Sequence, residues 1–98
     1  MENNSYSVAV LGAGNIGSAV ITRLQELDTD IVDINVTKVL VSDISKDRAV
    51  DKSLLTEDIK DIVDDDSIDL VIEVLGGVEP VKEYIKSLLS NGKAVITA

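Results

Sequence analysis

Three glycines near the N-terminus have the spacing of a turn that binds phosphate groups. Gly12, Gly14 and Gly17 fit the pattern G-x-G-x-x-G. In such a turn the first glycine permits a tight bend, the second lets a diphosphate approach the backbone, and the third lets a helix pack closely against a strand. Short glycine patterns arise often by chance, so this one is informative only if a strand precedes it and a helix follows it.

The flanking sequence meets that condition. Residues 7–11 form a continuous apolar run that predicts a buried strand, and apolar residues recur at helical spacing from Ile16 to Leu27. The first amides of that helix, those of Asn15 and Ile16, would donate to phosphate oxygens with help from the helix dipole. The alternative is a turn that only packs well. We expect a diphosphate to contact the whole turn, which comprises Gly12, Ala13, Gly14, Asn15, Ile16 and Gly17.

An acidic residue after the second strand is a candidate partner for the ribose of a dinucleotide. In this class of fold a carboxylate about 20 residues beyond the glycines binds the ribose hydroxyls. Asp43 stands 26 positions beyond Gly17, at the end of a strand predicted for residues 38–42. An Asp at this place could also simply form a turn. Lys46 and Arg48 follow and could bind a 2′-phosphate, so we expect the cofactor to be NAD or NADP.

A second group of candidate residues follows the fourth and fifth predicted strands. Leu75, Gly76 and Gly77 come directly after the strand predicted for residues 69–74, and Thr97 ends the last strand. Because the carboxyl ends of parallel strands meet at one edge of a sheet, these residues should face the same crevice as the glycine turn. The two glycines would let nicotinamide or its ribose approach the backbone, although a tight connection to a helix would use them too.

Other acidic residues suit structural roles better. Glu73 lies inside an apolar strand, where an unpartnered charge would cost several kcal/mol, so we expect it to face solvent or to find a hydrogen-bond partner. Asp64, Asp65 and Asp66 lack the alternating ligand spacing and the glycine of an EF-hand loop. We expect a solvated turn there and no metal site.

The remaining segments complete an alternation of strands and helices. We predict a strand at 54–56, a short helix at 58–63, a helix at 80–90 and a strand at 94–97, with the first helix fraying over 28–37. Gly92 should end the third helix in a left-handed conformation. Five apolar residues of that helix should face inward: Val81, Tyr84, Ile85, Leu88 and Leu89.

This alternation determines the expected fold class. Strands that alternate with helices pair in parallel through right-handed crossovers. We therefore predict an α/β domain of the Rossmann-like type. It would contain a doubly wound parallel sheet of strand order 3-2-1-4-5 between two layers of helices, in a three-layer αβα arrangement.

Composition limits both size and chemistry. The 98 residues, 45% of them hydrophobic, suffice for one domain. The sequence has no Cys and no His, which excludes disulfides, thiolate zinc sites, cysteine nucleophiles and Ser-His-Asp triads. A net charge of −9 argues against a nucleic-acid or membrane-binding surface. No apolar run could span a bilayer and the segment MENNSYS lacks the basic residues of a signal peptide, so we expect a cytoplasmic protein.

The second half of the chain resembles the cofactor-binding domain of homoserine dehydrogenase. Residues 69–80 read DLVIEVLGGVEP, and after a helix the chain continues with NGK at 91–93 and VITA at 95–98. The family pairs a segment of the form I-E-x-x-G-G-x-x-P with T-A-N-K at the end of the fifth strand. The resemblance extends over residues 8–98, and the Gly-Gly-Val-Glu-Pro connection is its most specific part.

The resemblance implies reversible hydride transfer between NAD(P)H and the aspartate semialdehyde/homoserine pair, in threonine and methionine biosynthesis. It matches residues 12–17 to the pyrophosphate loop, and residues 75–77 and Thr97 to the nicotinamide side. The family's lysine would stand two residues beyond Ala98, and its catalytic acid and substrate-binding residues lie further on. We therefore expect residues 1–98 to be the dinucleotide-binding domain of a longer, homo-oligomeric dehydrogenase, and to catalyse nothing alone.

Two other functions share the fold and the glycine turn. One is a regulatory NAD-binding module of a transport protein, and the other is a dehydrogenase acting on another amino acid. The Gly-Gly-Val-Glu-Pro connection and the terminal Ile-Thr-Ala favour the homoserine dehydrogenase resemblance over the first. Members that prefer NADP often carry a basic residue near the end of the second strand, where Ser42 precedes Asp43 here. That difference slightly favours NAD.

Overall fold

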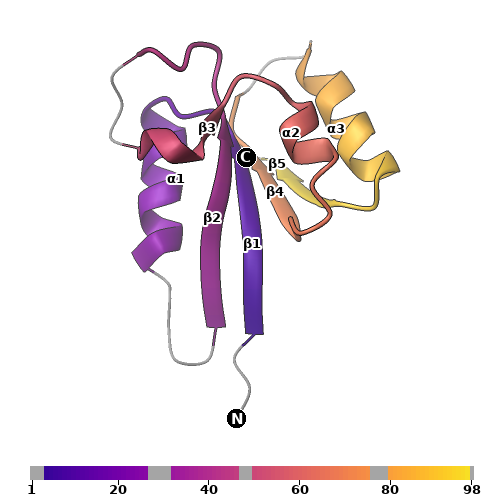
Figure 1. The fold of residues 1–98 in the computed structure, drawn as a ribbon, viewed down its shortest axis with the longest axis horizontal. Coiled ribbons are helices and arrows are strands. Elements are labelled where there is room, and N and C mark those ends of the chain that lie inside the picture. Colours follow the sequence, from indigo (N-terminus) through magenta and orange to yellow (C-terminus); the bar gives the residue numbers. More distant parts are fainter. Residues whose placement is uncertain (1–3, 27–31, 47–49, 76–79, 98) are drawn as a thin grey trace.

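The chain forms one sheet of five parallel strands in the computed structural model, which describes residues 4–26, 32–46, 50–75 and 80–97 (Figure 1). The strands are β1 (Asn4–Leu11), β2 (Val32–Leu40), β3 (Leu55–Thr56), β4 (Leu70–Glu73) and β5 (Ala94–Thr97). Their order across the sheet is β3-β2-β1-β4-β5. This is the order predicted from the sequence.

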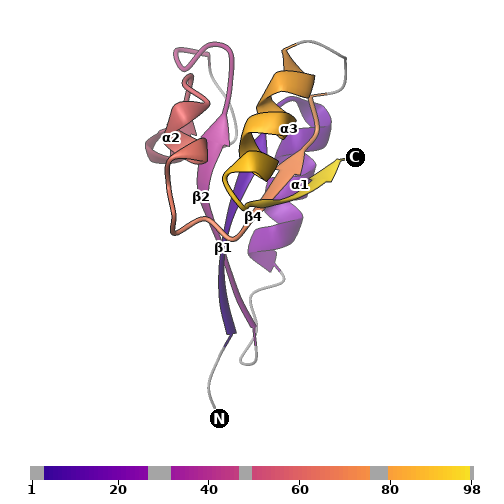
Figure 2. The same ribbon diagram turned by 90° about the vertical axis from the view of Figure 1, so that its right-hand side faces the viewer.

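Helices cover both faces of the sheet. They are α1 (Asn15–Glu26), α2 (Lys60–Val63) and α3 (Val81–Ser90), with a 3₁₀ turn, η1 (Lys52–Leu54), before β3. One face carries α1 and the other carries α2 and α3 (Figures 1 and 2). The predicted three-layer arrangement is confirmed. Because β1 leads to a helix on one face and its neighbour β4 leads to a helix on the other, the chain diverges at their carboxyl ends and leaves a crevice there.

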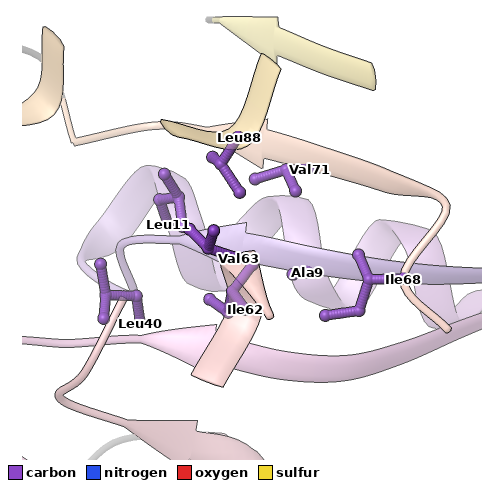
Figure 3. Close-up of a cluster of buried hydrophobic side chains, with 8 residues drawn as sticks. All are labelled: Ala9, Leu11, Leu40, Ile62, Val63, Ile68, Val71 and Leu88. Carbon is purple, nitrogen blue, oxygen red and sulfur yellow. The ribbon is translucent and has the colours of Figure 1, made fainter. Parts of the chain in front are cut away.

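The second half of β1, residues 8–11, is buried on both faces, as its continuous apolar sequence predicts. Successive side chains of a strand point to opposite faces. Ala9 and Leu11 accordingly join the cluster beneath α2 and α3, while Val10 joins the cluster beneath α1, and all three are fully buried. Figure 3 shows the cluster beneath α2 and α3, which consists of Ala9, Leu11, Leu40, Ile62, Val63, Ile68, Val71 and Leu88.

The second strand differs from its prediction. It begins at Val32, inside the segment expected to be a frayed helix, and it ends at Leu40 rather than at Ser42. Apolar and polar residues alternate from Val32 to Thr37, and this period of two is typical of a strand. Strand β1 also starts earlier than predicted, at Asn4, because it pairs with the added part of β2.

Short elements are shorter than predicted. Leu54 belongs to η1, so β3 contains two residues. Helix α2 begins at Lys60 rather than at Asp58, because the side chain of Asp58 accepts the Lys60 N–H at 2.9 Å and precedes the helix. In α3, Leu88 is fully buried as expected, whereas Leu89 is 57% exposed, contrary to the prediction.

The turns at the amino ends of β4 and β5 are joined by a buried lysine. Gly92 ends α3 with φ +79°, the left-handed conformation predicted for it. The next residue, Lys93, is 6% exposed, and its Nζ donates to the carbonyl oxygen of Asp65 at 2.6 Å. Asp65 also accepts the Ser67 N–H at 2.9 Å, while Asp64 and Asp66 are exposed, so the expected solvated turn is present.

The last strand is an edge of the sheet, as expected. Val95 packs against the cluster beneath α2 and α3, while Ile96 on the same strand is 52% exposed. Within the described ranges, no helix is both long and apolar enough to cross a membrane.

Candidate functional site

The chain turns sharply at Gly12, directly after β1. Gly12 has φ +108°, a backbone conformation that side chains rarely tolerate, and its N–H donates to the carbonyl oxygen of Leu40 at 2.9 Å. A Cβ on Gly12 would also lie 3.0 Å from Cδ2 of Leu75. The turn therefore requires glycine, and it brings the ends of β1, β2 and β4 together.

The other two glycines of the pattern have opposite surroundings. A Cβ on Gly17 would lie 2.4 Å from the carbonyl oxygen of Gly12, so the start of α1 packs directly on the turn. A Cβ on Gly14 would meet nothing within 4 Å. The packing roles predicted for Gly12 and Gly17 are present, and Gly14 exposes its backbone to open space where a bulky group could approach.

Helix α1 begins directly after this open backbone. The N–H of Ser18 donates to the carbonyl oxygen of Gly14 at 2.8 Å, and its hydroxyl donates to that of Ala13 at 3.1 Å. Since Ser18 makes the first bond of the helical ladder, the N–H groups of Asn15 and Ile16 precede the ladder and lack an intrahelical acceptor. These amides and the positive end of the helix dipole form an arrangement suited to an anion.

A hollow of about 490 Å³ opens at this turn. It lies at the carboxyl ends of β1, β2 and β4, where the crevice was expected. Its lining combines the glycine turn with the segments that follow β2 and β4: Gly12, Ala13, Gly14, Val41, Ser42, Lys46, Val74 and Leu75. Leu75, predicted as a site residue, is 42% exposed at this position.

A second hollow of about 330 Å³ adjoins the first, since Val41, Ser42 and Leu75 line both. Its other lining residues lie at the end of β2, directly after β3, and at or just before the start of α3: Leu40, Glu57, Pro80, Val81 and Tyr84. The two hollows together can receive an elongated ligand. Glu57 and Tyr84 were not predicted as site residues. Glu57 directly follows β3, and this place at the carboxyl edge of the sheet was the signal that could have identified it.

The loop after β2 is held by two carboxylates. Asp43 accepts both the N–H and the hydroxyl of Ser45 through Oδ1, at 2.9 and 2.6 Å. Glu57 accepts the N–H of Ile44 through Oε2 at 2.7 Å. Asp43 thus makes the turn considered as its alternative role. It is exposed beside Ser42, at the place where the fold class puts the ribose-binding acid, but it lines neither hollow.

The remaining predicted residues are only partly accounted for. Thr97 lies level with Glu73, which in turn lies level with Leu11, so Thr97 shares the carboxyl edge with the glycine turn but lines neither hollow. Gly76 and Gly77 lie outside the described residues.

Glu73 is only 5% exposed. No buried polar side-chain atom lacks a partner in the described part of the chain, so the expectation that a buried Glu73 would find a partner is confirmed.

The fold and the glycine turn define a dinucleotide-binding domain of the Rossmann type. Comparison with known proteins specifies which one. The family model described as "Homoserine dehydrogenase, NAD binding domain" matches residues 12–98. The chain belongs to this family of NAD-binding domains.

Named relatives agree with the family. The chain is 40% identical over 98 residues to a homoserine dehydrogenase of Bacillus subtilis. This alignment covers 93% of the chain and 23% of the relative. A crystal structure of S. aureus homoserine dehydrogenase at pH 8.5 superposes with a TM-score of 0.89 at 38% identity, covering 98% of this chain and 26% of that one. The homoserine dehydrogenase of Thiobacillus denitrificans gives a TM-score of 0.84 at 33% identity, covering 96% and 23%. The chain thus spans about a quarter of the length of these relatives.

Proposed function

We propose that the glycine turn binds the diphosphate of NAD or NADP, and that the chain is the cofactor domain of an enzyme that interconverts homoserine and aspartate semialdehyde. The observation that carries the proposal is the contrast between Gly14 and Gly17. The space beside the Cα atom of Gly17 is filled by the backbone of the turn. The space beside the Cα atom of Gly14 is open, and Gly14 lines the larger hollow. A diphosphate is a group that such a combination of close packing and open backbone accommodates.

The two hollows suggest how the ligand lies. The amides of Asn15 and Ile16 would donate to the diphosphate, with Lys46 at the side of the same hollow. The adenosine half would extend along Ser42 into the smaller hollow against Tyr84. The nicotinamide half would extend in the other direction, past Leu75 toward the edge that carries Thr97, and Gly76 and Gly77 would border it. The cofactor itself supplies hydride acceptance and donation.

Proton transfer and substrate binding would require other residues. The sequence contains no His, and the buried Glu73 already has a partner. We propose that the further three quarters of length seen in the relatives corresponds to a part that supplies these groups, covers the edge strand β5 and mediates homo-oligomer formation in the cytoplasm. Residues 1–98 alone would then bind the cofactor without catalysing the reaction.

Calorimetric titration of the purified chain with NAD and with NADP tests the binding proposal. We expect saturable binding of at least one of them, and loss of binding in Gly14→Val, whose side chain would occupy the open space at the turn. Unchanged binding by Gly14→Val would contradict the assignment of the turn. An assay for homoserine oxidation by the same sample should give no turnover. Detectable turnover would contradict the proposal that proton transfer and substrate binding require residues outside 1–98.

A further inference from the structure

Glu57 holds the loop after β2 and also lines the candidate site. It follows β3, is exposed, and lines the smaller hollow together with Ser42 and Tyr84. Its Oε2 accepts the N–H of Ile44 at 2.7 Å, so its carboxylate is held against the loop that follows β2. A long, exposed side chain is thereby fixed at one place on the wall of the hollow.

That place is next to the position of the adenosine ribose. In this fold class an acidic residue that follows the second strand lies at the ribose, and the corresponding residue here is Asp43, three positions beyond β2. Ile44, to which Glu57 is bonded, is its immediate neighbour. If the hollows hold a dinucleotide, the carboxylates of Asp43 and Glu57 would both lie near the 2′-hydroxyl, where NADP carries a phosphate with a charge of about −2.

Among the described residues that line the two hollows, the positively charged side chain is placed elsewhere, and Arg48 lies outside the described residues. Lys46 lines the larger hollow with Gly12 and Gly14, and it does not line the smaller hollow. It is therefore placed to balance the diphosphate, which NAD and NADP share, rather than the 2′-phosphate, which distinguishes them. Selectivity in binding sites often depends on such a repulsive group aimed at the unwanted ligand.

We propose that Glu57 is a specificity-determining residue that favours NAD over NADP, because its fixed carboxylate repels the 2′-phosphate. This inference rests on the proposed function, since it assumes that the two hollows hold a dinucleotide. This role differs from the one considered for Asp43. Glu57 would weaken the binding of NADP by repulsion, whereas Asp43 would bind the ribose by hydrogen bonding.

Glu57→Gln separates the charge from the hydrogen bond. The amide oxygen of Gln can still accept the Ile44 N–H, so the loop keeps its position while the negative charge is lost. We expect the Kd for NADP to fall about threefold to tenfold and the Kd for NAD to change less than about twofold, as removal of one partly solvated like charge predicts. The difference should shrink at high salt, because the interaction is exposed to screening ions.

Glu26→Gln is the matched control, since it makes the same charge change at the far end of α1 on an exposed side chain. It should leave the ratio of the two Kd values unchanged. Glu57→Lys provides a second variant, which should shift the ratio further toward NADP. An unchanged ratio in Glu57→Gln and Glu57→Lys, with NAD still bound, would overturn the inference and leave the proposed function intact. Failure of the wild-type chain to bind either dinucleotide would overturn both.

Discussion

Gly17 packs on Gly12 so closely that no side chain fits between them. A Cβ on Gly17 would lie 2.4 Å from the carbonyl oxygen and 2.8 Å from the carbonyl carbon of Gly12. Both contacts are with backbone atoms, which cannot rotate away as a flexible side chain could. The third glycine of the pattern therefore serves the packing of the helix on the turn.

Gly17→Ala should for this reason destabilise the fold. We expect the free energy of unfolding to fall by about 1–3 kcal/mol, the usual effect of inserting an atom into a packed interior. Urea unfolding of the two proteins would measure it. Gly14→Ala is the matched control, since a Cβ there meets nothing within 4 Å, and its stability should stay within about 0.5 kcal/mol of wild type. Equal destabilisation by both substitutions would contradict this account of the turn.

Two neighbouring leucines of α3 should differ in their contribution to stability. Leu88 is fully buried against β4, whereas Leu89 is 57% exposed. Leu88→Ala should lower the free energy of unfolding by about 3 kcal/mol through lost burial and the cavity left behind. Leu89→Ala should change it by less than about 0.5 kcal/mol, as surface substitutions usually do. Similar losses would indicate that α3 is rotated relative to the structure, and thermal or urea unfolding would distinguish the cases.

The buried lysine offers a test of the contacts at the amino ends of β4 and β5. Lys93→Met keeps most of the aliphatic side chain but removes the ammonium group that donates to the Asp65 carbonyl. We expect a loss of about 1–2 kcal/mol, because the Asp65 carbonyl loses a charged donor. Lys86→Met, on the exposed face of α3, should have almost no effect. Equal effects in urea unfolding would show that the Lys93 contact contributes nothing.

The same turn predicts a pH-dependent contribution to stability. The hydroxyl of Ser67, and then its N–H, hold the pKa of Asp65 below its ordinary value by hydrogen bonding to the carboxylate. A lowered pKa in the folded state stabilises the protein above the pKa of the unfolded chain, and this contribution disappears as the pH falls through the folded-state pKa. Ser67→Ala should therefore be less stable than wild type at neutral pH, and the deficit should shrink as the carboxyl becomes protonated. Urea unfolding across the acidic range measures this, and a deficit that grew with falling pH would refute it.

Sequence reasoning predicted the strand order because the strongest signals were local. The apolar run before Gly12 and the turn residues Pro80 and Gly92 each mark a boundary without reference to the rest of the fold. It failed at the start of β2, where the alternation that begins at Val32 was interpreted as helix fraying. It also failed at Leu89, because helical spacing gives a face about 100° wide or more and does not say where that face ends.

The candidate site was less predictable than the fold because part of it depends on distant residues. The glycine turn follows from spacing within six positions. The wall formed by Glu57 and Tyr84 depends on how β3 and α3 approach the end of β2. The place of Glu57 after a predicted strand indicates the carboxyl edge of the sheet, but it does not indicate that Tyr84 lies there too. Asp43 was correctly placed after β2, but its hydrogen bonds to Ser45 appear only in three dimensions.

Amide chemical shifts during titration with NAD test the central claim most directly. If the open amides at the start of α1 bind the diphosphate, the largest changes will occur at Gly14, Asn15 and Ile16. The chemical shifts of amides near the opposite edge of the sheet, where the amino ends of the strands lie, will stay unchanged; those of Ser67 and Gly92 are examples. Saturable shifts confined to that opposite edge, with residues 12–17 unaffected, would contradict the account.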